Sequence, residues 1–211
     1  MNFDELSTIQ LDALREIGNI GAGNAATSMS KMINEKIDMQ VPSVKIVAFN
    51  EVMDMIGGAD SLIVAVMFQI HGDAPGTVYL LFTMEEAEAL VGHITLNSDV
   101  KLFDEGAPNE FAISALQETG NILAGSYLSA LSDFTKMNMH PSIPHLSIDM
   151  AGAILTVGLL ELSQVTDYAI IIDTKINDVN MKNGINGQFM LLPAPESFTK
   201  IFRALGINDY D

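Results

Sequence analysis

The stretch ALREIGNIGAG, residues 13–23, decides how the whole chain is interpreted, because it occurs twice. Its second copy, ALQETGNILAG, spans residues 115–125, and eight of the eleven positions are identical. About one identity is expected by chance from typical residue frequencies. The chain is therefore an internal duplication. The same shift of 102 residues superimposes three further pairs: Asp12 on Ser114, Ser30 on Ser132, and Pro42 on Pro144.

Three glycines, Gly18, Gly21 and Gly23, fall within the first copy, although its pattern is helical. A glycine in a helix interior costs roughly 0.5–1 kcal/mol relative to alanine. The three together cost about 2 kcal/mol, so we expect a role that offsets this loss. We expect them to thin the helix so that its polar face can approach another surface closely.

Each copy begins with a long helical pattern, at about residues 6–33 and 108–135. Apolar residues recur there at helical spacing: Ile9, Leu14, Ile17 and Ile20 in the first copy, and Phe111, Leu116, Ile122 and Leu128 in the second. Strand-like segments follow: SVKIVAF, SLIVAVMFQI and GTVYLLFT, and later HLSIDM, AILTVGLLEL, YAIIIDTK and GQFMLLP. HGDAPG is typical of a hairpin connection. Further helices are expected at MEEAEALVGHI, residues 84–94, and near residues 196–205.

This order of a helix, mainly hairpin-linked strands and a helix, repeated once, predicts an α+β fold with pseudo-twofold symmetry and largely antiparallel strands. A half of about 100 residues alone would leave one sheet face poorly covered. We therefore expect one domain over residues 1–211, made of two repeats at about 6–95 and 108–206. A connector at about residues 96–107 joins them.

The composition indicates a soluble cytoplasmic protein with a sizeable core. Of the 211 residues, 48% are hydrophobic, yet the apolar runs are far shorter than the ~20 residues of a membrane span. The N-terminal MNFDELSTIQ lacks the basic and apolar regions of a signal peptide. The absence of cysteine excludes disulfides, thiolate nucleophiles and Cys-metal sites.

The formal net charge is −17, which disfavours binding to a nucleic-acid backbone, since such binding needs Lys and Arg. It would suit a partner with basic groups around its working face. Solubility alone is the alternative explanation for most of these charges.

A polar triplet recurs on both long helices. Glu16 and Asn19 are three residues apart and share one helix face, with Asp12 one turn before and Gly23 one turn after. The alternative is a solvated face whose glycines only let two helices cross. Retention of Glu, Asn and Gly in both copies argues against it. The second copy has the same register: Ser114, Glu118, Asn121 and Gly125.

Two other chemistries are weak. GAGNAA, residues 21–26, matches the dinucleotide fingerprint G-x-G-x-x-G/A, but that motif needs a buried strand directly before it. The segment that precedes it here is charged and helical. The four histidines show no spacing suited to a metal, so no metal or cofactor is expected on this chain.

At the recurring polar residues the sequence resembles the CheC-type chemotaxis phosphatases, a family that also includes CheX and FliY. Its pattern is Asp/Ser-x3-Glu-x2-Asn, then 22 residues, then Pro. Within the family the two matches and the chain length indicate the CheC type, because CheX types carry one site and FliY types a further C-terminal switch domain. Both copies fit the pattern, each with 22 intervening residues: Asp12-Glu16-Asn19-Pro42 and Ser114-Glu118-Asn121-Pro144.

The resemblance implies a hydrolase that removes phosphate from the aspartyl phosphate of the response regulator CheY, with Mg²⁺ on the regulator. Asn19 and Asn121 are then expected to orient the attacking water. Glu16 and Glu118 are expected to pair with a lysine near the phosphorylation site. Positioning and electrostatics dominate such phosphoryl transfers.

The remaining residues of the pattern and the glycine one turn after each asparagine are expected to support the site: Asp12, Ser114, Pro42, Pro144, Gly23 and Gly125. The prolines are expected to end the link into the first strand of each half. The resemblance also implies the receptor deamidase CheD as a partner, with Asp149 at its contact position. A monomer with an internal pseudo-dimer is expected. The rival interpretation is a non-enzymatic binding or adaptor module of the chemotaxis or flagellar switch system.

Overall fold

The computed structural model describes residues 8–162, 168–178 and 184–206. The first half of the chain forms α1 (Thr8–Ile33), β1 (Ile37–Ala48), α2 (Phe49–Met55), β2 (Leu62–Gly72), β3 (Gly76–Thr83) and α3 (Met84–Ile94). A short hairpin follows, β4 (Phe103–Asp104) and β5 (Ala107–Pro108). The second half forms α4 (Glu110–Thr135), β6 (Met139–Pro141), β7 (His145–Met150), α5 (Ala151–Leu162), β8 (Tyr168–Asp178), β9 (Ile185–Pro193) and α6 (Pro195–Ala204). The expected long helices, the β2–β3 hairpin and the helix at residues 84–94 are confirmed.

The two halves exchange strands within one sheet. Its order is β1-β8-β9-β3-β2-β6, with β7 also paired to β2, and every pairing is antiparallel. The first strand of each half therefore pairs with the second strand of the other half, and β3 and β9 join them in the middle. The predicted α+β fold with mainly antiparallel strands is confirmed. The repeat boundaries and the assignment of residues 1–211 to one domain stay predictions.

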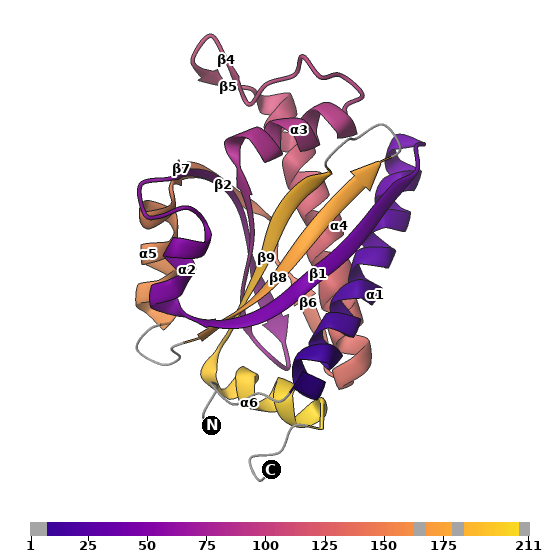
Figure 1. Cartoon of the computed structure of the whole chain (residues 1–211), viewed down its shortest axis with the longest axis vertical. Coiled ribbons are helices and arrows are strands. Elements are labelled where there is room, and N and C mark those ends of the chain that lie inside the picture. Colours follow the sequence, from indigo (N-terminus) through magenta and orange to yellow (C-terminus); the bar gives the residue numbers. More distant parts are fainter. Residues whose placement is uncertain (1–7, 163–167, 179–183, 207–211) are drawn as a thin grey trace.

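Helices cover both faces of this sheet (Figure 1). On one face α1, α3, α4 and α6 contribute to the larger apolar cluster, and on the other face α2 and α5 contribute to the smaller one. Side chains alternate between the faces along β2: Val64 and Val66 join the larger cluster, and Ile63 and Ala65 the smaller. Because both faces are covered, the central strands read as continuous apolar runs.

One expected strand is wrong. AILTVGLLEL lies in the helix α5, which covers the second face of the sheet. Ala151 and Leu155, one helical turn apart, are both buried there. A continuous apolar run does not distinguish a buried strand from a buried helix by periodicity, so the sequence pattern was ambiguous at this point.

The duplication extends to matching local contacts. The Ser30 hydroxyl accepts a hydrogen bond from the Ile37 N–H at 2.9 Å, and the Ser132 hydroxyl accepts one from the Met139 N–H at 3.3 Å. Each bond joins the end of a long helix to the strand that follows. The retained serine is therefore explained by the helix-to-strand connection of each half.

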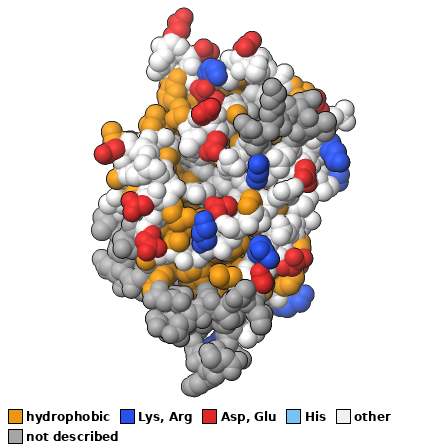
Figure 2. All heavy atoms as spheres, viewed as in Figure 1, with side chains coloured by type: hydrophobic (Ala, Val, Ile, Leu, Met, Phe, Trp, Pro, Cys, Tyr) orange, Lys and Arg blue, Asp and Glu red, His pale blue; other side chains and the backbone are white. Residues whose placement is uncertain are grey.

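On the face that Figure 2 shows, acidic and basic side chains are interspersed. Among the residues described, no helix is both long and apolar enough to cross a membrane.

α1 and α4 approach each other closely at Gly21 and Tyr127. A Cβ at Gly21 would lie 2.9 Å from the Cα of Tyr127, so the two backbones meet closely. The Tyr127 ring packs on Phe189, and its hydroxyl lies 2.9 Å from that of Thr174. Burial raises the pKa of Tyr127 to about 12, against the smaller opposing effect of the Thr174 hydrogen bond.

Tyr127→Phe should therefore change the alkaline stability. The pKa of Tyr127 is near 10 in the unfolded chain and about 12 in the fold, so the unfolded state releases its proton first as pH rises. Between pH 10 and 12 this lowers the free energy of unfolding by about 2–3 kcal/mol. Urea unfolding at pH 8 and pH 11 should show that the free energy of unfolding falls less between these two pH values in Tyr127→Phe than in the parent protein. At pH 8 the variant should itself be about 1–2 kcal/mol less stable, because the buried Thr174 hydroxyl loses its partner. An equally steep alkaline loss in the variant would contradict this assignment.

Candidate site on the paired helices

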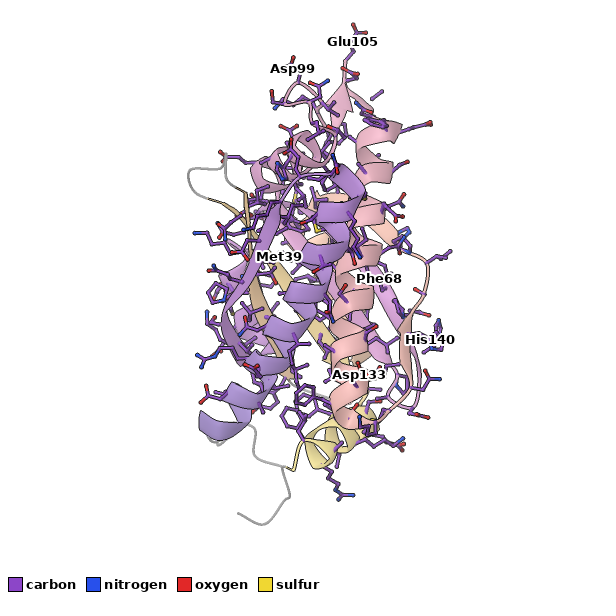
Figure 3. All side chains as sticks on the ribbon, turned by 90° about the vertical axis from the view of Figure 1, so that its right-hand side faces the viewer. Met39, Phe68, Asp99, Glu105, Asp133 and His140 are labelled. Atoms are coloured by element: carbon purple, nitrogen blue, oxygen red, sulfur yellow. The ribbon has the colours of Figure 1, made fainter. Side chains whose placement is uncertain are left out.

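The recurring Glu-Asn pairs lie on the exposed faces of α1 and α4. Figure 3 shows these two helices side by side, facing the viewer. All four side chains are exposed: Glu16, Asn19, Glu118 and Asn121. The opposite face of each helix packs on the sheet, as the buried Leu14 and Leu116 indicate. The amphipathic pattern therefore turns both polar triplets outward.

The expected apolar set of the helices is correct only in part. Leu14, Ile17, Leu116 and Leu128 are buried, but Ile20 is 38% exposed and Phe111 is 62% exposed. Phe111 lies seven residues before Glu118, so it occupies the same face of α4 two turns away. An exposed phenylalanine on a polar face can supply apolar contact to a docking partner.

The Asn19 amide is held by the first strand. The backbone N–H of Val41 donates a hydrogen bond to Oδ1 of Asn19 at 3.2 Å. The β1–β8 register shifts between Gln40 and Ser43, which places Val41 and Pro42 in a β-bulge. A bulge releases backbone groups from the ladder, and here the released N–H reaches the helix.

The second copy lacks this contact. The counterpart of β1 is broken, since β6 ends at Pro141 and β7 begins at His145. Ile143, which corresponds to Val41 under the 102-residue shift, is 88% exposed. No residue that the structure describes forms a hydrogen bond with the Asn121 side chain.

The two glutamates have no cationic partner within the described part of the chain. Arg15, next to Glu16, instead pairs with Asp12 at 2.9 Å. The supporting role expected for Asp12 stays a prediction. Ser114, its counterpart, is exposed and makes no side-chain hydrogen bond with any described residue. Both glutamates therefore remain available to a cation from outside.

The glycines divide into two groups, which corrects the expectation that all of them thin the helix. Gly18 and Gly21 are buried, where a Cβ would meet Val41 and Tyr127 respectively. They serve packing inside the protein. At Gly23 and Gly125 a Cβ would have no neighbour within 4 Å, so only these two leave space on the outer faces.

The prolines and Asp149 lie outside the two long helices that carry the glutamates. Pro42 is inside β1 rather than at the end of the link before it, so that expectation is wrong for the first copy. Pro144 lies between β6 and β7 and directly precedes β7, so it ends the link into the expected strand HLSIDM but not the link that follows α4. Asp149 is exposed on β7, and its Oδ1 accepts a hydrogen bond from the Met150 N–H at 2.7 Å.

The candidate site is an open face rather than a cleft. A cavity of about 330 Å³ lies elsewhere, lined by residues that include Met55, Leu81 and Gln188, and no residue of α1 or α4 lines it. Among the described residues no group of three or more His, Cys, Asp or Glu could hold a metal ion. An exposed polar face suits a macromolecular partner better than a small ligand, which favours concave pockets.

Sequence reasoning missed the Val41 N–H. A backbone group leaves no mark in residue type, and the constant spacing from asparagine to proline does not reveal it, because both copies share that spacing and only the first shows the contact among the described residues. That spacing places Pro42, which has no N–H to give to the ladder, directly after the residue that donates.

Comparisons with known proteins agree with the duplication. The model of the CheC-like family matches twice, at residues 9–46 and 111–148. The chain is 42% identical over 206 residues to "CheY-P phosphatase CheC" of Bacillus subtilis, covering 98% of both chains. It is 28% identical over 145 residues to "Flagellar motor switch phosphatase FliY" of the same organism, covering 69% of this chain and 37% of that one.

A solved structure supports the fold. Thermotoga maritima FliY superposes with a TM-score of 0.73 at 19% identity, covering 96% of this chain and 99% of that one. The fold, the doubled family match and the nearly full-length 42% identity agree. The chain belongs to the CheC-like family.

Proposed function

We propose that this protein is a phosphatase that hydrolyses the aspartyl phosphate of the response regulator CheY. The observation that carries the proposal is a pair of exposed Glu-x-x-Asn faces in a chain 42% identical, over nearly its full length, to a CheY-P phosphatase. Two open polar faces fit a protein substrate. The acidic surplus of the chain, a net charge of −17, favours a partner with basic groups around its reacting centre.

The amides act on water. With one lone pair of Oδ1 engaged by Val41, the Asn19 amide still offers two N–H donors and a second lone pair. It holds a water in line with the phosphorus–oxygen bond of the aspartyl phosphate, and Asn121 does so at the second face. Neither amide acts as a base, since an acyl phosphate is already reactive and Mg²⁺ on the regulator neutralises the phosphoryl oxygens.

The carboxylates dock the substrate. Glu16 and Glu118, which have no cationic partner among the described residues, pair with a lysine of the regulator and draw it away from the phosphate. An exposed ion pair contributes only about 0.2–1 kcal/mol, so other contacts must add to docking. At the second face Phe111, 62% exposed, supplies apolar area.

The deciding experiment follows the decay of phosphorylated CheY after the phosphodonor has been removed. Addition of this protein, at a tenth of the regulator concentration, should accelerate phosphate release over many turnovers. Magnesium must be present for the regulator in both arms. A decay rate that does not change would refute the enzymatic proposal.

The alternative function is a binding module that sequesters phosphorylated CheY. It predicts stoichiometric binding without faster release, so the same substoichiometric assay separates the two. The Asn side chains favour the enzyme, because docking alone needs no amide one turn from a carboxylate.

We further propose that the deamidase CheD binds at Asp149, on β7 and away from the α1–α4 faces. Asp149→Lys should weaken CheD binding about tenfold by placing a cation where the partner meets an anion. Hydrolysis without CheD should be unchanged. Asp104→Lys, the same charge change on the exposed β4–β5 hairpin, is the matched control. Equal affinity of CheD for Asp149→Lys and the parent would exclude this position.

A further inference from the structure

We propose that the two Glu-x-x-Asn faces are not equivalent, and that the backbone N–H of Val41 is a positioning group that makes the Asn19 face turn over faster than the Asn121 face. This inference rests on the proposed hydrolysis, because it assigns a rate difference to its two sites. It concerns a main-chain group that no side-chain pattern identifies.

The bulge in β1 makes the donor available. Val41 and Pro42 together oppose one residue of β8 between the register pairs Gln40–Lys175 and Ser43–Asp173. Because two residues oppose one, a backbone group in the bulge is free to point away from the ladder. Its N–H reaches Asn19 on α1, 22 residues earlier, at 3.2 Å.

The surroundings of Val41 hold this donor in place. The side chain is buried, at 5% exposure, and its two methyl carbons would lie 3.4 Å from a Cβ at Gly18. Gly18 directly precedes Asn19 in the chain and lies on the buried side of α1. Strand and helix are therefore packed together directly beneath the amide, so the N–H is a rigid anchor for Asn19 Oδ1.

The second face has no such anchor. A Cβ at Gly120, the counterpart of Gly18, would meet Val66 and Phe68 of β2 rather than the segment between β6 and β7. That segment carries Ile143, 88% exposed. The Asn121 amide therefore keeps its rotamer freedom, unless the bound substrate orders it.

A fixed amide changes turnover rather than docking. Holding a reacting group in its productive geometry before the reaction removes an entropic cost from the barrier. The Asn19 face should therefore have a kcat several-fold above that of the Asn121 face. KM depends on the glutamates and their neighbours and need not follow the same order.

Single-site enzymes isolate the two faces. Asn121→Ala leaves only the Asn19 face, and Asn19→Ala leaves only the Asn121 face. Phosphate release measured over a range of phosphorylated CheY concentrations should give the higher kcat to Asn121→Ala. If both single-site enzymes hydrolyse with equal kcat, the inference is wrong while the proposed function stands. If neither they nor the unaltered protein hydrolyses phosphorylated CheY, the proposed function itself fails.

Removing the N–H tests the mechanism. Val41→Pro, made in the Asn121→Ala background, deletes the donor and should lower kcat several-fold with KM nearly unchanged. Ile143→Pro in the Asn19→Ala background is the matched control, since it also creates a Pro-Pro pair but removes no bond to an asparagine. An unchanged kcat in the folded Val41→Pro enzyme would overturn the role of the N–H.

Nitrogen relaxation of the unaltered protein tests the inference even if Val41→Pro does not fold. The side-chain amide signals of Asn19 and Asn121 are assigned by their loss in the two alanine variants. Nitrogen relaxation should give Asn19 a clearly higher order parameter than Asn121. Equal mobility of the two amides would contradict the inference.

Discussion

Replacing both Asn19 and Asn121 by alanine should remove nearly all hydrolysis of phosphorylated CheY, while either single replacement should leave the activity of the other face. Removing the amide frees the water but keeps the carboxylate, so docking should largely survive. A loss of about 3 kcal/mol in transition-state stabilisation slows turnover at that face roughly a hundredfold. Phosphate release at saturating and limiting substrate checks this, because kcat should fall and KM should change little.

Two controls make this result specific. Asn24→Ala changes another exposed asparagine of α1 that lies off the Glu-Asn face, and it should leave hydrolysis intact. Glu16→Gln with Glu118→Gln should instead raise KM, since the ion pair to the regulator is lost. A double Asn variant that hydrolysed at the parental rate would defeat the water-positioning mechanism and favour the binding module.

The duplication is the part of the fold that sequence predicts best. The 102-residue shift is matched by local contacts at the ends of the long helices, where Ser30 and Ser132 form matching bonds to the following strand. The predicted secondary structure was correct where the hydrophobic periodicity was strong, as in α3 and the β2–β3 hairpin. It failed at α5, where an apolar run can equally belong to a buried strand or a buried helix.

The exchange of strands could not be read from the sequence. β1 and β8 pair across more than a hundred residues, with Ile37 opposite Asp178, and local patterns carry no information about such partners. The sequence also did not predict the break between β6 and β7. The corresponding segment of the first half is one continuous strand, β1. Small differences around a shared proline therefore give one half a bulge and the other a break.

For the candidate site, residue types and spacing predicted which side chains face outward, but not what holds them. Glu16, Asn19, Glu118 and Asn121 are exposed as expected. The hydrogen bond from Val41 to Asn19 is a main-chain contact, so the two matching motifs look alike in sequence and differ in structure. Their catalytic roles remain predictions.

Gly21→Val should strongly destabilise the fold, because the backbones of α1 and α4 approach closely at this residue. A Cβ there would lie 2.9 Å from both the Cα and a ring carbon of Tyr127, so one backbone must move. Overpacking of this kind costs about 3 kcal/mol when main chain is the obstacle. In a chain of this size that lowers the melting temperature by about 10 °C, which calorimetry would detect.

Gly23→Val supplies the contrast, two residues along the same helix. Nothing lies within 4 Å of a Cβ at Gly23, and valine is no worse than glycine in a helix, so stability should change by less than about 0.5 kcal/mol. If open backbone at Gly23 admits the regulator, this variant in the Asn121→Ala background should raise KM for phosphorylated CheY while its melting temperature is retained. Equal stability of Gly21→Val and Gly23→Val would contradict the packing role of Gly21. An unchanged KM in Gly23→Val would mean that the space over Gly23 is not used in docking, and that this glycine is tolerated rather than required.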